Sequence, residues 1–261
     1  LAAYGLAKII VEMFAHKKTR ITSPLSIFSA MQTKLTGVWA LWILSSVATI
    51  ADEGFKPIFN GEDLTGWDGK EGAWEVRDGE IWCTGKSETN NWLIYQESEP
   101  ANFILRMEFR WDAGNSGVQV RSDRQGDWQV FGYQVEIAQQ NKMGLWHHSR
   151  LDTEHPKKKA RHKMTTAGEH AFISEDGSRE NVKVAEAEAI QARYRENQWN
   201  TLEIEARGDV LIQKINGVEF AKLTDNDSEM SRRKGFIAIQ DHGKGCQVAF
   251  RNIQLKQLKD D

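Results

Sequence analysis

A carboxylate and an amide alternate with apolar residues in the segment Tyr133-Gln-Val-Glu-Ile137. Residues two apart in a strand lie on the same face, so Gln134 and Glu136 are expected on one face and Val135 and Ile137 on the other. A carboxylate near the operating pH can act as a general base, and Glu136 is therefore our first candidate for acid–base chemistry. The alternative interpretation is an ordinary solvated strand face.

A second polar segment runs from Asn115 to Arg121 as Asn-Ser-Gly-Val-Gln-Val-Arg. By the same alternation Gln119 and Arg121 should share a face. Arg121 is a candidate for holding a developing oxyanion or a hydroxyl group, and a surface salt bridge is the alternative. Asn115 and Ser116 are expected mainly to shape the turn, although Asn115 also counts among the candidate ligand contacts.

Gln240 and His242 end another predicted strand, just before Gly243. His242 could act as a second acid–base group or a metal ligand, whereas many histidines are simply hydrogen-bonded parts of the structure. Further histidines lie between the polar segments, but adjacent histidines of a strand point to opposite sides and no spacing matches a zinc motif. They are His147, His148, His155, His162 and His170. We therefore assign no metal, while a divalent metal stays an open alternative.

Three tryptophans, Trp92, Trp128 and Trp146, could stack on a flat ligand, and the other tryptophans are expected in the core. The stretch His155-Pro-Lys-Lys-Lys-Ala-Arg-His162 is basic, and we interpret it as a solvated loop. No Gly-x-Ser-x-Gly motif, P-loop or dinucleotide fingerprint follows residue 51. The sequence thus gives no sign of a nucleotide or dinucleotide cofactor.

These side chains must be positioned by strands, because period-two alternation recurs along the chain. The pairs Asp78-Gly79 and Asn216-Gly217 are strong hairpin turns. Strands are predicted at Trp74–Arg77, Glu80–Thr84, Phe103–Trp111, Thr201–Ala206, Val210–Ile215, Val218–Leu223, Phe236–Gln240, Gln247–Arg251 and Ile253–Leu258. One short helix is expected at Ala185–Tyr194, and Arg150–Asn181 is expected to be a long polar interruption. This pattern predicts an all-β antiparallel sandwich or jelly roll.

The N-terminal 51 residues differ from the rest. Residues 31–51 combine a cationic start, an apolar run from Leu35 to Val47 and a small-residue exit, which predicts a signal peptide cleaved after Ala48 or Ala51. A membrane anchor is the alternative, but the apolar run is short for a spanning helix. Residues 1–30 precede Met31, and we interpret them as a non-native upstream extension. Residues 52–261 then form one exported, periplasmic or secreted domain.

Composition agrees with a globular domain. The 261 residues are 40% hydrophobic and 27% charged, with a mean hydropathy of −0.57, which excludes a disordered chain and a multispanning membrane protein. Residues 1–51 hold five bases and one acid, so residues 52–261 have 29 bases against 36 acids and a formal charge of −7. Such an acidic domain is a poor nucleic-acid partner. Its two cysteines, Cys83 and Cys246, could pair in an oxidising compartment or stay buried thiols.

Seven segments, in order between Phe55 and Leu258, resemble one known family, that of the 3-keto-disaccharide hydrolase domain of exported bacterial proteins. They are Ile58–Trp67, Gly114–Arg121, Gly132–Ile137, Trp199-Asn200, Ile215–Gly217, Gly235–His242 and Val248–Ile253. The resemblance implies a concanavalin-like jelly roll that acts on oxidised sugars. One stretch departs from it: Gly144-Leu-Trp-His-His148 stands where similar sequences often have Gly-x-Leu-Tyr followed by acidic residues, so the role of those acids is in doubt here.

The resemblance also implies a chemistry. A ketone at C3 acidifies the C2 proton, and the resulting enolate can expel the C1 oxygen before water adds. Glu136 would be the base and Arg121 the stabiliser, with His242 as a further catalytic candidate. The candidate substrate contacts are Asn115, Gln119, Gln134, Trp146, His147 and Gln240. A separate sugar 3-dehydrogenase would supply the substrate.

Two rival functions stay open at this point. A noncatalytic carbohydrate-binding module on the same fold would need no convergent base, and the altered Gly144–His148 stretch keeps it in consideration. An ordinary glycosidase would need a second carboxylate roughly 5–10 Å from Glu136. The sequence offers none.

Overall fold

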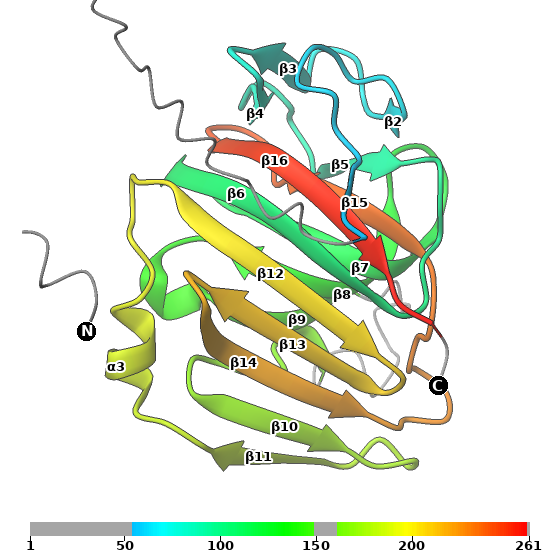
Figure 1. The fold of residues 1–261 in the computed structure, drawn as a ribbon, viewed down its shortest axis with the longest axis vertical. Helices are drawn as coiled ribbons and strands as arrows, with labels where there is room; N and C mark the ends of the chain where they lie inside the picture. Colours follow the sequence, from blue (N-terminus) through cyan, green and yellow to red (C-terminus); the bar gives the residue numbers. More distant parts are fainter. Residues whose placement is uncertain (1–53, 149–160, 260–261) are drawn as a thin grey trace, which may run out of the picture. The chain divides into compact units, whose positions relative to one another are not determined.

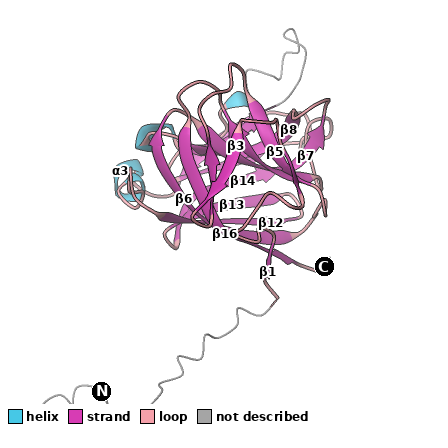
Figure 2. Cartoon of the chain, turned by 90° about the horizontal axis from the view of Figure 1, so that it is seen from above, coloured by secondary structure: helices cyan, strands magenta, loops and turns pink. Residues whose placement is uncertain are grey.

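The computed structural model describes residues 54–148 and 161–259. They form two stacked β-sheets; Figure 1 looks onto the larger sheet with the smaller sheet behind it, and Figure 2 shows the molecule from above. The predicted signal peptide and upstream extension lie outside the described residues. No helix in the described part of the chain is long and apolar enough to cross a membrane.

The larger sheet has ten strands in the described residues, in the order β11-β10-β14-β13-β12-β6-β16-β4-β3, with β1 paired to β16. Their bounds are β1 Lys56–Pro57, β3 Trp74–Arg77, β4 Glu80–Cys83, β6 Phe103–Ala113, β10 Glu169–Ile173, β11 Arg179–Lys183, β12 Asn200–Arg207, β13 Val210–Ile215, β14 Val218–Asp225 and β16 Gln247–Gln257. The pair β10–β14 is parallel, while the other pairs of this sheet are antiparallel.

The smaller sheet has six strands in the order β2-β5-β15-β7-β8-β9. Their bounds are β2 Trp67–Asp68, β5 Asn91–Tyr95, β7 Ser116–Arg124, β8 Val130–Ile137, β9 Gly144–His148 and β15 Phe236–Asp241. A 3-10 turn at Gln140–Lys142 joins β8 to β9, and the helix α3 spans Ala187–Gln191. The predicted all-β sandwich is thus confirmed.

Alternation builds the core between the sheets. In β6, Phe103, Leu105, Met107 and Phe109 are buried while the residues between them are half-buried. They pack with Val118, Val120, Tyr133, Val135 and Ile137 of the smaller sheet in one cluster. Two hairpins form at the predicted dipeptides, because Asp78-Gly79 and Asn216-Gly217 all adopt positive φ. Because the alternate side chains of β7, β8 and β15 fill this core, the others point away from it, and these can contact a ligand.

The structure corrects three details of the sequence-based prediction. The Arg150–Asn181 stretch is not one long interruption, since β10 and part of β11 lie within it. The helix is shorter than predicted, at Ala187–Gln191. The two predicted C-terminal strands form a single strand, β16, with an irregularity between Arg251 and Gln254 where Asn252 has a φ of +53°.

Candidate functional site

Glu136 and Gln134 lie on the face of β8 that is turned away from the core, as the alternation predicted. Their neighbours Tyr133, Val135 and Ile137 belong to the core cluster. Paired residues of adjacent strands place their side chains on the same face. One row across the sheet is therefore Trp92–Gln240–Gly117–Glu136–Gly144, and the next contains Gln119–Gln134–Trp146.

Two amides hold the Glu136 carboxylate. Asn115 Nδ2, from the β6–β7 turn, donates to Glu136 Oε1, and Gln134 Nε2 donates to Oε2 at 2.9 Å. Gln134 Nε2 also donates to Gln240 Oε1 at 2.9 Å, while Gln134 Oε1 accepts from Gln119 Nε2 at 3.2 Å. The structure thus brings together four of the six predicted substrate contacts around the predicted base.

Glycine at position 117 makes this arrangement possible. A Cβ at Gly117 would lie 2.4 Å from Cδ and Nε2 of Gln134, so no other residue leaves room for the amide. The amide of Gln134 therefore lies over the β7 backbone, where it reaches Glu136 on one side and Gln240 on the other. The glycine of β7 thus provides the space that the Gln134 side chain of β8 occupies.

Burial makes Glu136 a better base than an exposed glutamate. Its side chain is only 4% exposed, and the loss of solvation raises its pKa above the ordinary value of 4.5. The hydrogen bonds from Asn115 and Gln134, and the charges of Lys142 and Lys163, act in the opposite direction without cancelling the rise. A carboxylate with a raised pKa is suited to accept a proton.

Two donors beside Glu136 have no hydrogen-bond partner among the described residues. They are Gln240 Nε2 and Trp146 Nε1, both buried atoms. Unpaired buried donors are rare and often mark a ligand position. Trp146 shares its row with Gln134 and also pairs with Lys163, so Lys163 belongs on the same face. The ring of His162 stands edge-on to Trp146, with centroids 4.7 Å apart.

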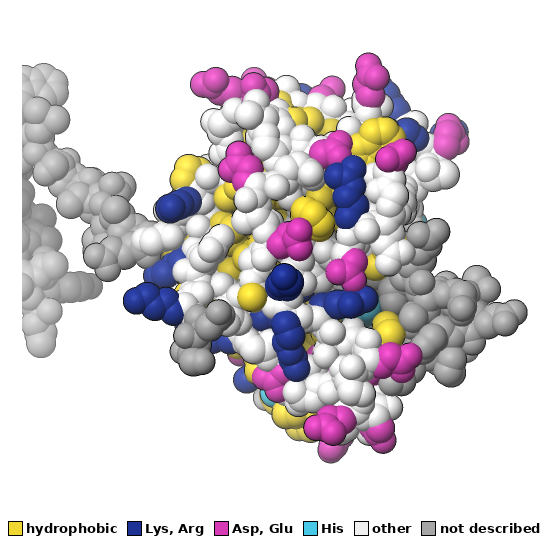
Figure 3. Space-filling view, turned by 90° about the vertical axis from the view of Figure 1, so that its right-hand side faces the viewer, with side chains coloured by type: hydrophobic (Ala, Val, Ile, Leu, Met, Phe, Trp, Pro, Cys, Tyr) yellow, Lys and Arg dark blue, Asp and Glu magenta, His cyan; other side chains and the backbone are white. Residues whose placement is uncertain are grey.

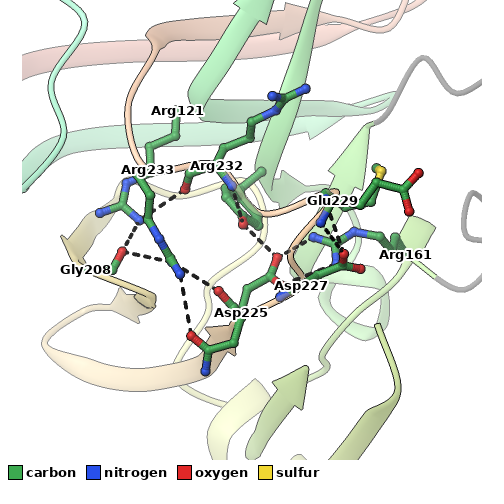
Figure 4. Close-up of polar contacts among 11 residues, drawn as sticks. Arg121, Arg161, Gly208, Asp225, Asp227, Glu229, Arg232 and Arg233 are labelled. Atoms are coloured by element: carbon green, nitrogen blue, oxygen red, sulfur yellow. Dashed lines mark hydrogen bonds and ion pairs between the residues drawn. The ribbon is translucent and has the colours of Figure 1, made fainter. Parts of the chain in front are cut away.

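Arg121 does not reach this face, which corrects the sequence-based assignment. Its Nη2 donates to Ala101 O at 2.7 Å, its Nε to the same oxygen at 3.0 Å and its Nη1 to Gly208 O at 2.7 Å. Figure 4 shows the side chain among Gly208, Arg232 and Arg233. Burial lowers its pKa to about 10. Arg121 therefore ties loops of the fold together and has no contact with Glu136.

A bulge explains the failed alternation. The register of β7 against β8 shifts between Val120 and Asp123, and Arg121 has a φ of +50°. An extra residue in one strand reverses the side-chain alternation beyond it. Gln119 and Arg121 consequently do not share a face.

His147 also lies elsewhere than predicted. It pairs with Tyr133 in the register of β8 and β9, and its ring stands edge-on to that tyrosine on the core side. It is 3% exposed. His147 is therefore not a substrate contact on the Glu136 face.

His242 is exposed and directly follows Asp241, the last residue of β15. Asp241 pairs with Ser116, so His242 and Asn115 both leave the sheet at the same end. The structure gives no contact between His242 and Glu136 in the described residues. Its catalytic role stays a prediction.

Two of the three candidate stacking tryptophans serve the fold. Trp92 is buried against Ile94, Val130 and Ala238, and Trp128 Nε1 donates to Asp68 Oδ1 at 3.0 Å. Trp146 alone of the three combines a half-buried ring with an unpaired indole nitrogen. It stays the candidate ring contact.

The histidines do not gather into a metal site within the described residues. His170 Nε2 lies 3.0 Å from Thr224 Oγ1, His162 stands edge-on to Trp146, and His155 lies outside the described residues. The described chain instead brings together one other set of metal-ligating types: Cys83, Asp241 and Cys246. Sequence spacing did not place Asp241 beside the two cysteines, because Cys83 is far along the chain from Asp241 and Cys246.

Lys163 was missed by the sequence analysis. It stands at the end of a basic stretch that we interpreted as a solvated loop, and only its bridge to Trp146 places it near Glu136. Charge type alone could not distinguish it from its neighbours. Its pairing with Trp146 joins residues that are far apart in the sequence.

The comparisons agree with this fold and region. A family model described as the 3-keto-alpha-glucoside-1,2-lyase-like domain matches residues 54–256. The chain belongs to this family. The match contains the whole Glu136 face, and no curated protein sequence matches the chain.

Solved structures share the fold of this lyase-like domain. Two proposed glycosyl hydrolases from Parabacteroides distasonis ATCC 8503 are 18% and 22% identical to it, with TM-scores of 0.53 and 0.51. The alignments cover 79% and 78% of this chain and 95% and 99% of those chains. A Bacillus subtilis protein of unknown function with a galectin-like fold is 10% identical, with a TM-score of 0.50 and coverage of 79% and 96%. At these identities the likeness concerns the fold alone.

Proposed function

We propose that this chain cleaves 3-keto-glycosides by abstraction of the C2 proton, elimination of the C1 substituent and addition of water. Membership of a 3-keto-glucoside lyase-like family supports the substrate class. The observation that carries the mechanism is the buried Glu136 carboxylate, held by two amides on the outer face of the smaller sheet.

In this mechanism a Glu136 oxygen takes the C2 proton, and the electron pair of the C–H bond forms the enolate of the C3 ketone. The enolate then re-forms the carbonyl as the C1–O bond breaks, and the leaving oxygen takes a proton. Water adds to C1 of the enone and the C2 proton returns. No electrons leave the sugar, so the prior oxidation at C3 must come from a separate dehydrogenase.

The neighbours of Glu136 have defined parts in this proposal. Gln240 Nε2 and Trp146 Nε1 are free to donate to sugar hydroxyls, and the Trp146 ring can contact the sugar. Lys163 takes the place of Arg121 as the cation for the developing enolate, because it lies on the face of Trp146 and its charge, like that of Lys142, acts on Glu136. Export to the periplasm or medium is part of the proposal and follows from residues 31–51 alone.

The test compares the purified protein on a 3-keto-glucoside and on its unoxidised parent, each with and without a chelator. We expect release from the keto sugar alone. Glu136→Gln should lower kcat by at least about 100-fold, the lower end of the usual range for loss of a general base. Glu75→Gln, at a half-exposed glutamate of β3, is the matched control and should leave the rate unchanged.

Other outcomes identify the rivals. Release from both sugars would favour an ordinary glycosidase. Release from neither, with measurable sugar binding, would favour the noncatalytic carbohydrate-binding module. Loss of activity with the chelator would show that the reaction needs a metal.

A further inference from the structure

Two cysteines lie together behind the Glu136 face. Cys83 ends β4 and Cys246 lies in the turn between β15 and β16, and both are buried in the core cluster. Their sulfur atoms and a carboxylate oxygen of Asp241 all lie within 4.8 Å of one another. The structure holds both as free thiols.

We propose that Cys83 and Cys246 form a structural disulfide in the mature protein. The bond would join the β3–β4 hairpin to the β15–β16 turn and so close most of the domain into a single covalent loop. This inference does not depend on the proposed catalytic activity, but it rests on the same export, which residues 31–51 predict.

The backbone around Cys246 packs closely against Gly85, two residues after Cys83, and against Gly114. A Cβ at Gly85 would lie 2.7 Å from Cys246 O, and one at Gly114 would lie 2.8 Å from Cys246 Cα. Gly245 N also donates to Gly85 O at 3.0 Å. Because the backbone is packed this closely, the bond must form by side-chain rotation, and the staggered cysteine rotamers allow such movements.

Forming the bond leaves no strong polar group unpaired. Cys83 Sγ makes only a weak contact with Gln240 O, at 3.7 Å, and that oxygen keeps the hydroxyl of Ser116 at 2.6 Å. Asp241 keeps Asn91 Nδ2 at 3.2 Å and Gly243 N at 2.9 Å. Burial and the neighbouring Cys246 raise the pKa of Cys83 well above its ordinary value, so Cys83 would be a neutral, unreactive thiol in the reduced protein.

A metal fits the same cluster less well. Closed structural zinc sites use four protein ligands, whereas the cluster in the described residues has three. Both oxygens of the third ligand, Asp241, already accept hydrogen bonds. A covalent bond needs only the two sulfurs.

The oxidation is balanced by thiol–disulfide exchange during folding. The two thiols lose two hydrogens and form one S–S bond, while an oxidised dithiol catalyst or oxidised glutathione becomes reduced. The bond would stabilise the fold mainly by restricting the unfolded chain, and this effect is largest for long loops. It would also fix the backbone of Gln240, whose side chain contacts Gln134.

The test uses the purified protein refolded with oxidised and reduced glutathione. We expect no free thiol in denaturant, a mass lower by two hydrogens than after reduction, and a crosslinked peptide containing both cysteines. Reduction should lower Tm by roughly 5–15 °C, and the C83S/C246S variant should show no such shift. Two thiols that still titrate in denaturant would overturn the proposal, as would one equivalent of zinc retained by the wild type and lost in C83S/C246S. The thiol count needs no sugar and no activity, so its failure is distinct from failure of the proposed function.

Discussion

At the scale of single residues, alternation predicted the face of Glu136 correctly and that of Arg121 wrongly. Glu136 and Gln134 belong to a regular stretch of β8, where period two holds from Tyr133 to Ile137. Arg121 stands at a bulge with positive φ, and no sequence signal marks the extra residue. Regular strand segments are predictable from the sequence, whereas a bulge depends on the partner strand.

The pH dependence of the proposed reaction should depend on Asn115. Its amide stabilises the ionised form of Glu136 and so keeps the raised pKa from rising further. In Asn115→Ala that pKa should be higher still, which leaves the base protonated over more of the acid range. We expect the acid limb of kcat/KM to move to higher pH, with the rate at high pH less affected. A pH–rate profile measures this, and an unchanged limb would separate Asn115 from the base.

Arg121 should matter for stability and not for chemistry. Arg121→Met removes the donors to Ala101 O and Gly208 O and leaves these carbonyls without that partner. Gly208 O keeps the donor Arg233 Nη1 at 3.3 Å, so the loss is that of the hydrogen bonds from a charged donor, each worth about 1.5–3 kcal/mol. Urea unfolding should show a loss of at least that size, while kcat/KM per folded molecule stays near that of the wild type. If kcat fell by about 100-fold while stability stayed normal, Arg121 would have a part in the reaction and this prediction would be wrong.

At the scale of elements, the sequence predicted strands with clear alternation and missed several without it. The five residues of β11 are all exposed, so Arg179–Lys183 carries no apolar period. Its partner β10 is short, and it pairs in parallel with β14, a contact between distant segments. Strands of this kind are defined by long-range pairing, which a single sequence does not contain.

The packing of β7 against β8 can be tested at Gly117. In Gly117→Ala the new Cβ would overlap the Gln134 amide, which must move away from Glu136 and Gln240. Overpacking of this kind costs about 1–3 kcal/mol, and we expect activity to fall together with stability. The double variant G117A/Q134A removes the overlap and should regain stability without regaining activity. Urea unfolding and kcat/KM are measured for the wild type, G117A, Q134A and G117A/Q134A. If the stability losses of the two single variants simply add in the double variant, the overlap between the two side chains is contradicted.

At the scale of the whole molecule, one buried ionic cluster connects the two sheets. Tyr133 of the smaller sheet donates to Asp225 Oδ2 of the larger one at 2.7 Å. Arg161 pairs with Asp225 and, at 3.4 Å, with Asp227, and Figure 4 shows these groups side by side. The surface has no such concentration of charges on the face drawn in Figure 3, where basic and acidic side chains are interspersed. The sequence did not single out these residues, because they meet only after the sheets stack.

This cluster should contribute far more to stability than an ion pair at the surface. Arg161, Asp225 and Asp227 are at most 4% exposed, and Arg161→Leu would remove the buried cation that pairs with both carboxylates. Breaking a buried pair in this way costs about 3–5 kcal/mol. The matched control is Arg232→Ala, which removes an ion pair with Asp123 whose side chains are 42% and 43% exposed and should cost no more than about 1 kcal/mol. Urea unfolding of both variants measures the difference. Equal losses would mean that the Arg161 cluster adds no more than an exposed pair, and that apolar packing alone holds the two sheets together.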